Sequence, residues 1–168
     1  DTLSLHDALP IWIDLYLESL YRFRESYQGE RDIVAFLLVP AWEAGPRTEL
    51  QYLLNHPTET QEQALQYPCL SHWLYNTESD RAVAHIRHRG LDRVDSKVKV
   101  IFVPCYLNGL DGIFDLTYYD LLVGMDLTVY PSYYEPWGYT PLESIRYGVP
   151  TITTTLAGFG LWAEEEQT

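Results

Sequence analysis

Two glutamates, Glu135 and Glu143, lie close enough in the sequence to act on one ligand. Glu135 lies just after a short apolar run that ends at Tyr130, which is typical of a strand. Glu143 follows Thr140 and Pro141, a pair that is typical of a helix start. Because open α/β sheets bind their ligands where strands lead into loops and helices, the two carboxylates indicate a ligand site.

A second interpretation of Glu143 is purely structural. Thr140 and Glu143 have the T-x-x-E spacing of a capping box, with Pro141 at the first helical position, so Glu143 could only accept the backbone N–H of Thr140. Both roles can coexist, since the helix dipole keeps such a carboxylate ionised. Glu135 fits no capping pattern, and the Trp137-Gly138 pair behind it favours a close, partly buried loop over a solvated charge.

Composition excludes several functions. With 24 acidic and 11 basic residues, the formal net charge is −13, which argues against nucleic-acid binding but not against a small phosphorylated ligand. Aromatic residues make up 14% of the chain and could stack on sugars or bases, although most of them fit a core or a surface. Cys69 and Cys105 give no disulfide framework, so we expect a reducing, cytoplasmic setting. The sequence shows no membrane span and no signal peptide.

Strands alternate with helices along the chain, which predicts βαβ units. We therefore expect an α/β fold with a Rossmann-like parallel sheet and flanking helices. The predicted strands are residues 33–39, 98–103, 126–130 and 150–155, and the predicted helices are residues 12–27, 77–89, 117–124 and 140–147. Asn76 or Thr77 should cap the second helix, since Thr77 and Asp80 have capping-box spacing. Residues 41–75 read as an irregular insertion with short helices near 49–54 and 61–66.

The ends of the chain look different from its middle. Residues 1–11, D-T-L-S-L-H-D-A-L-P-I, resemble a translated adapter sequence and are excluded from the predicted fold. The C-terminal A-E-E-E-Q-T stops just after a predicted helix start. We therefore expect a fragment, in which residues 12–168 form part of a Rossmann-like domain.

Several runs of sequence together resemble one family. The run Y-P-S-Y-Y-E-P-W-G-Y-T-P-L-E-S at 130–144 and the run G-V-P-T-I-T-T-T-L-A-G-F-G at 148–160 resemble the glycogen synthases of glycosyltransferase family 3, the animal and fungal type that also occurs in some bacteria. Further runs look similar, namely V-K-V-I-F-V-P-C-Y-L-N-G-L-D-G-I-F, Y-Y-D-L-L-V-G-M-D-L-T-V-Y-P-S and I-D-L-Y-L-E-S-L-Y-R. The resemblance covers nearly everything after Ile11.

The resemblance implies a retaining transferase of the two-domain GT-B fold, which moves glucose from UDP-glucose to the non-reducing end of an α-1,4-glucan without a metal or cofactor. This chain would be part of the C-terminal, donor-binding domain. The implied roles are a catalytic carboxylate beside the donor glucose (Glu135), backbone donors to its hydroxyls (Trp137, Gly138), contacts to the diphosphate (Tyr139, Thr140), a ribose ligand (Glu143) and a ring on the uracil (Tyr118, with Tyr119 as an added candidate).

The same resemblance sets the expected partners and limits. The expected partners are UDP-glucose, glycogen and the N-terminal GT-B domain, and neither nucleic acid nor a membrane is expected. The formation of a homo-oligomer is an open alternative. The family has a basic pair just before the helix at Ile13, where this chain carries residues 1–11, so we expect the chain as written to be inactive. Two alternatives are another retaining GT-B transferase with a different acceptor, such as a sucrose- or trehalose-type enzyme, and a non-catalytic nucleotide-sugar binding module, which would not require Glu135.

Two weaker patterns have modest interpretations. His85 and His88 could be metal ligands, but at the end of a predicted helix they fit better as complements of the helix dipole. Gly158 and Gly160 form only a G-x-G pattern, too short for a dinucleotide fingerprint, and predict a tight strand-to-helix turn.

Overall fold

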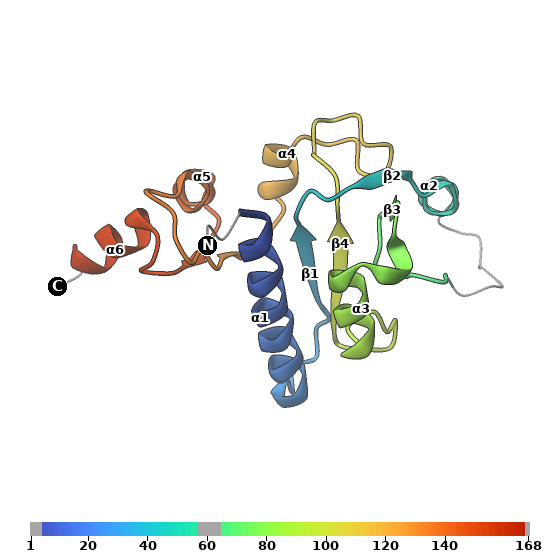
Figure 1. The fold of residues 1–168 in the computed structure, drawn as a ribbon, viewed down its shortest axis with the longest axis horizontal. Helices are drawn as coiled ribbons and strands as arrows, with labels where there is room; N and C mark the ends of the chain where they lie inside the picture. Colours follow the sequence, from blue (N-terminus) through green and yellow to red (C-terminus); the bar gives the residue numbers. More distant parts are fainter. Residues whose placement is uncertain (1–4, 57–64, 167–168) are drawn as a thin grey trace. The chain divides into compact units, whose positions relative to one another are not determined.

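The structure, a computed structural model, describes residues 5–56 and 65–166 and has a mixed α/β fold (Figure 1). Small parallel sheets are flanked by helices, which confirms the predicted fold class. The chain forms two compact units, Asp1–Asp115 and Leu116–Thr168, and each is described by itself. Among the described helices, none combines the length and the apolar character that crossing a bilayer requires.

The sheet of the first unit is a parallel pair. Strand β1 (Ile33–Leu38) pairs with β4 (Val98–Val103) in a register that runs from Ile33 opposite Val98 to Leu38 opposite Val103. Both strands are continuous apolar runs, as is usual for parallel strands covered by helices. The sequence predicts β4 with its observed bounds and β1 with one residue too many.

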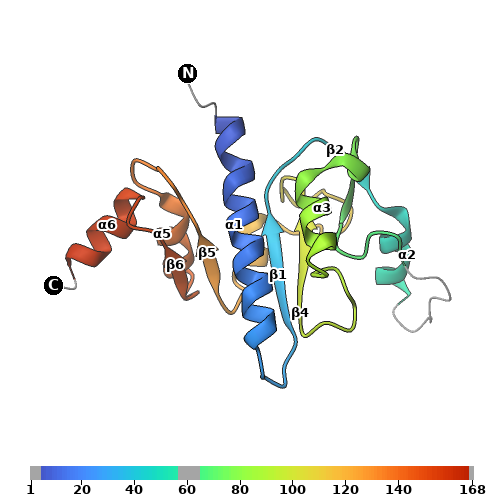
Figure 2. The same ribbon diagram turned by 60° about the horizontal axis from the view of Figure 1, so that its bottom comes forward.

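Helices α1 (Leu5–Ser26) and α3 (Arg81–His88) lie along one face of this pair (Figures 1 and 2). Leu17 of α1 and Ile86 of α3 have 0% exposure and pack with the buried side chains of the strands. The other members of this core are Leu37, Tyr67, Cys69, Leu70, Leu74, Ala82, Val83, Leu91, Val100 and Phe102. Helix α1 begins at Leu5 and not at the predicted residue 12; residues 1–4 lie outside the described residues.

The predicted cap of α3 is wrong. The side chain of Asp80 caps this helix by accepting a hydrogen bond from the backbone N–H of Val83 at 2.9 Å. Thr77 instead begins the short 3-10 helix η1 (Thr77–Ser79), and its hydroxyl bonds the backbone of Leu74. A carboxylate directly before the helix outcompetes the threonine because it accepts the N–H and also complements the dipole.

Residues 41–75 contain more order than the predicted irregular insertion. Strand β2 (Glu43–Pro46) pairs antiparallel with β3 (His72–Leu74), and α2 (Thr48–Asn55) follows β2 where a short helix was predicted. The fully buried Arg47 ties the segment together: its guanidinium donates to the carbonyls of Tyr67 and Leu70 and lies 4.6 Å from the centre of the Trp73 ring. Most of the helix predicted at 61–66 lies outside the described residues.

The second unit is a β-α-β arrangement with a helix at each end. It contains α4 (Tyr118–Leu122), β5 (Thr128–Tyr130), α5 (Tyr139–Arg146), β6 (Thr151–Thr153) and α6 (Gly158–Glu165). Strands β5 and β6 pair in parallel, and α5 packs against both. All four predicted strands therefore exist, and they form two parallel pairs, one in each unit.

We expect Val100→Ala to lower the free energy of unfolding of the first unit by about 2 kcal/mol, since it removes two buried methyl groups from β4. Val100 is 1% exposed, whereas Val94, which offers the same substitution, is 78% exposed. Val94→Ala should change stability by less than about 0.5 kcal/mol. Urea unfolding of both variants measures the difference, and equal effects would contradict the assigned core.

Candidate functional site

The loops that follow β5 and β6 are joined along their backbones. A parallel bridge between Glu135 and Ala157 continues the pairing of the two strands past their carboxyl ends. The hydroxyl of Thr154 donates to the carbonyl of Ser132, which connects the two loops a second time. These loops therefore present their residues at the edge of the strand pair where α/β proteins bind ligands.

Helix α6 closes tightly onto the first of these loops. The N–H of Gly158 donates to the carbonyl of Glu135 at 3.1 Å, and that of Phe159 donates to the carbonyl of Trp137 at 2.6 Å. A Cβ on Gly158 would lie 2.2 Å from the carbonyl oxygen of Pro136, so only glycine allows this approach. The predicted tight strand-to-helix connection is present between β6 and α6, but Gly158 and Gly160 lie in the first turn of the helix and not in the connection itself.

The carboxylate of Glu135 is held on two sides. Ser132 donates its hydroxyl hydrogen to Oε2 of Glu135 at 3.0 Å. The backbone of Gly138 closes the other side, because a Cβ there would lie 3.1 Å from the same oxygen. Ser132 was missed from the sequence, although a hydroxyl residue three positions before a loop carboxylate is a recognisable turn signal.

The predicted capping box at the start of α5 is wrong. The N-cap is Gly138, with a φ of 88°, and no side chain of the described residues caps this helix. Thr140 is already helical and Pro141 follows it, so the helix starts earlier than the box requires. A glycine in the left-handed region lets the chain turn into the helix, and no side chain of the described residues caps the first N–H groups of α5.

Glu143 bonds a neighbouring tyrosine and not the backbone of its own helix. The hydroxyl of Tyr119 donates to Oε1 of Glu143 at 3.0 Å. This hydrogen bond raises the pKa of Tyr119, because ionising the phenol would place two negative charges together. The Tyr119 ring also stacks on Tyr147, with 5.5 Å between ring centres. The half-buried Glu143 is thus a fixed acceptor on the side of α5 that meets α4.

Tyr118 is fixed by a chain of hydroxyl groups. Its hydroxyl lies 2.8 Å from that of Tyr130, which in turn lies 2.7 Å from the hydroxyl of the fully buried Ser144. Burial first, and then the hydrogen bond with Tyr130, raises the pKa of Tyr118 well above its usual value. Its ring stays neutral and stands edge-on to Tyr119 at 5.4 Å.

Trp137 and Tyr139 differ in their surroundings. The Trp137 ring, 37% exposed, lies 6.0 Å from the ring of Phe159 and 6.2 Å from that of Trp162, so it packs against α6. Tyr139 is the first residue of α5 and is 69% exposed. The resemblance implies a backbone role for Trp137 and a diphosphate contact for Tyr139, and both residues lie next to the start of α5.

The predicted site residues thus form two groups around one helix. Glu135, Trp137 and Gly138 lie in the loop that leads into α5, whereas Glu143 and Tyr118 lie where α5 meets α4. Within the described part of the chain, Glu135 and Glu143 share no hydrogen-bond partner. One group offers a carboxylate beside a positive helix end, and the other offers an acceptor and aromatic rings.

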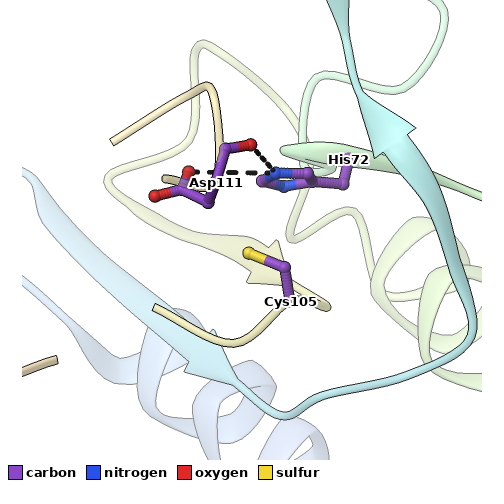
Figure 3. Close-up of side chains that lie close together, drawn as sticks. All are labelled: His72, Cys105 and Asp111. Carbon is purple, nitrogen blue, oxygen red and sulfur yellow. Dashed lines mark hydrogen bonds and ion pairs between the residues drawn. The ribbon is translucent and has the colours of Figure 1, made fainter. Parts of the chain in front are cut away.

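The described residues bring metal-ligand types together elsewhere, in the first unit. His72, Cys105 and Asp111 have ligand atoms within 4.8 Å of one another (Figure 3). Of the two histidines considered from the sequence, His85 has its Nδ1 2.9 Å from Oδ1 of Asp14 in α1. His85 and His88 both lie in the last turn of α3, where the dipole favours positive charge.

The second unit defines a class, that of α/β proteins with a parallel strand pair whose carboxyl-end loops lie beside a helix N-terminus without a side-chain cap, the place where such proteins bind ligands. The sequence model of the glycogen synthase family matches residues 47–168, a range that includes every predicted site residue. The chain therefore belongs to the glycogen synthase family, and the resemblance stated from its motifs is confirmed.

Curated relatives agree with this assignment. The chain is 43% identical over 99 residues to glycogen (starch) synthase isoform 1 of Saccharomyces cerevisiae, covering 58% of this chain and 14% of that protein. It is 38% identical over 121 residues to the liver glycogen (starch) synthase of Mus musculus, covering 71% of this chain and 17% of that protein. The chain thus spans about one sixth of the length of these relatives.

Two glycines allow the contact with Glu135 to be tested. Gly138 (φ 88°) and Gly148 (φ 79°) both have positive φ, but a Cβ meets Glu135 only at Gly138 and meets nothing within 4 Å at Gly148. We expect each alanine variant to lose about 1–2 kcal/mol from backbone strain. Only Gly138→Ala should also displace Glu135 from Ser132, visible as shifts of the amide NMR signals of both residues. Equal shifts in Gly148→Ala would refute the contact.

Proposed function

We propose that this chain is the donor-binding part of a retaining glucosyltransferase that moves glucose from UDP-glucose to the non-reducing end of an α-1,4-glucan. One observation carries the proposal: in a member of the glycogen synthase family, Glu135 is fixed at the carboxyl end of β5 beside the uncapped start of α5. The relatives that the chain matches are themselves named glycogen synthases.

In this proposal the start of α5 binds the diphosphate. The first N–H groups of a helix and its dipole attract phosphate, and here they belong to Tyr139 and Thr140. Helix α6 is less suited, because its first two N–H groups already donate to the carbonyls of Glu135 and Trp137. The negative charge that develops on the leaving diphosphate is thus stabilised by donors that are in place before the reaction.

Glu135 serves the sugar. A retaining glucosyl transfer passes through an oxocarbenium-like centre, and a nearby carboxylate stabilises its positive charge. Ser132 bonds one oxygen of this carboxylate at 3.0 Å, which orients the group without neutralising it. The backbone N–H groups of Trp137 and Gly138, at the same turn, are the proposed donors to the glucose hydroxyls.

The second group serves the nucleoside. A carboxylate offers about four acceptor positions, and Tyr119 uses one of them on Glu143. Glu143 can therefore accept hydrogen bonds from both ribose hydroxyls while Tyr119 holds it in place. The neutral, fixed ring of Tyr118 is the proposed stacking surface for uracil, with Tyr119 standing edge-on beside it.

The remaining parts of the proposal concern the whole enzyme. We propose a glucan acceptor, an N-terminal GT-B domain that completes the site, and a cytoplasmic setting. No metal or cofactor has a role in the proposed reaction. The chain alone should bind the donor but transfer no glucose; incorporation of glucose from UDP-glucose into glycogen above background by the chain would contradict this.

We expect Glu143→Gln to weaken binding of UDP to the chain by roughly tenfold to a hundredfold, because hydrogen bonds to a charged acceptor contribute about 1.5–3 kcal/mol. Isothermal titration calorimetry with UDP measures the change. The control is Glu164→Gln, the same substitution at an exposed position of α6, which should leave affinity unchanged. Equal affinities for UDP in the unaltered chain, Glu143→Gln and Glu164→Gln would show that Glu143 does not bind the donor.

A second test separates an enzyme from a binding module. In a full-length enzyme that contains this sequence, Glu135→Gln should lower kcat on the order of a hundredfold to a thousandfold, as loss of one transition-state-stabilising group does. Affinity for UDP, which lacks the glucose, should stay within about threefold, since Glu135 serves the sugar only. Unchanged turnover would show that this carboxylate is not catalytic.

A further inference from the structure

Three side chains that the proposed function does not use converge inside the first unit. His72 lies in β3, Cys105 follows β4, and Asp111 lies in the loop beyond it. Figure 3 shows the imidazole of His72 directed at Asp111, with dashed lines to its backbone carbonyl and its carboxylate, and the thiol of Cys105 nearby. The side chains of His72 and Asp111 are 2% and 0% exposed, and Cys105 is 9% exposed. Such a set of one nitrogen, one sulfur and one oxygen donor is uncommon in an apolar interior.

We propose that His72, Cys105 and Asp111 bind one divalent transition-metal ion, with Zn²⁺ as the best match. Imidazole, thiolate and carboxylate are the ligands that zinc takes in proteins. The thiolate disfavours Mg²⁺ and Ca²⁺, which prefer oxygen ligands only. One thiolate and one carboxylate also balance a charge of +2, so the occupied site is neutral, which is the least costly state for a buried group.

The spacing is close to what zinc requires. Zinc–ligand bonds of 2.0–2.3 Å in a tetrahedron place the ligand atoms about 3.5 Å apart. Nε2 of His72 lies 3.8 Å from Oδ1 of Asp111, and all three ligand atoms lie within 4.8 Å of one another. Closing the site therefore requires movements of about 1 Å in the side chains and a shift of the Asp111 carbonyl oxygen, which lies 2.9 Å from Nε2. Three protein ligands leave a fourth position for water.

The Asp111 carboxylate is already oriented by its own loop. Oδ1 accepts the backbone N–H groups of Ile113 and Phe114 at 3.0 and 2.9 Å, and Oδ2 accepts that of Asp115 at 2.9 Å. The loop is anchored in turn by Gln51 of α2, whose side chain donates to the carbonyl of Gly112 at 2.6 Å. Such hydrogen bonds to a ligand are characteristic of metal sites, because they fix its direction.

His72 can bond Ser71 in both of the tautomers that the proposal requires. Nε2 lies 2.9 Å from the carbonyl oxygen of Asp111, and Nδ1 lies 2.9 Å from the hydroxyl of Ser71. Without metal, Nε2–H donates to that carbonyl and the Ser71 hydroxyl donates to Nδ1. The same hydroxyl also lies 3.2 Å from the carbonyl of Phe102. With metal on Nε2, Nδ1–H donates to Ser71, which then donates to Phe102.

Binding releases one proton. The Cys105 thiol gives its proton to solvent and binds as thiolate, while the imidazole only exchanges Nε2–H for Nδ1–H and stays neutral. Burial first, and then the charges of Asp111 and Glu43, raises the pKa of Cys105 to about 11. The thiol is therefore protonated at neutral pH without metal. The carboxylates that disfavour the free thiolate favour a cation beside it.

Titration of the chain with Co²⁺, a spectroscopic substitute for Zn²⁺, tests the proposal directly. We expect one equivalent to bind, with a near-ultraviolet thiolate-to-cobalt charge-transfer band that Zn²⁺ abolishes. Cys105→Ser should lose this band, whereas Cys69→Ser, which alters the other buried free cysteine, should keep it. The absence of a saturable band, or its survival in Cys105→Ser, overturns the proposal.

A second variant keeps all three ligands, so that weaker metal binding in it cannot be attributed to the loss of a ligand or to misfolding. Ser71→Ala should fold, retain the cobalt band and weaken metal binding by about 10–100-fold, as loss of a partner hydrogen bond to a ligand does. Unchanged affinity in a folded Ser71→Ala contradicts the proposed role of His72. Glu143→Gln should bind metal as the unaltered chain does, so the result stands apart from that of the donor-site tests.

Discussion

The backbone of residues 131–138 depends on hydrogen bonds from residues that follow the next strand. The bridge between Glu135 and Ala157 and the N–H groups of Gly158 and Phe159 satisfy carbonyls of this loop, which has no regular structure of its own. These bonds hold the Glu135 backbone and leave its side chain to Ser132 and Gly138. The loop group of the candidate site, which contains Glu135, Trp137 and Gly138, is arranged around this pairing.

The same hydrogen bonds leave different N-terminal N–H groups available in helices α5 and α6. Helix α6 uses its first N–H groups to close the loop, whereas α5 begins at a glycine without a side-chain cap. Only α5 therefore keeps its positive end for an anion. Glu135 and Glu143 are separated in the same way: one belongs to the loop and the other to the contact between α5 and α4.

Much of this was predictable because parallel strands and glycine turns have strong local signals. The apolar run of β4 and the short connection from β6 to α6 were predicted correctly from sequence. Both predicted capping boxes were wrong, because Asp80 and Gly138 occupied the cap positions for reasons that depend on the neighbouring chain. The convergence of His72, Cys105 and Asp111 was invisible, since only tertiary packing brings β3 to the end of β4.

The close approach of α6 also limits how this site can be moved to another protein. The run 130–144 contains every carboxylate of the site, and it would be the natural segment to graft onto a different scaffold. A graft of that run alone would lose the carbonyl partners at Gly158 and Phe159 and the backbone contact at Pro136 that excludes any side chain at Gly158. The smallest transplantable unit therefore extends from α4, which supplies Tyr118 and the Tyr119 partner of Glu143, through the first turn of α6.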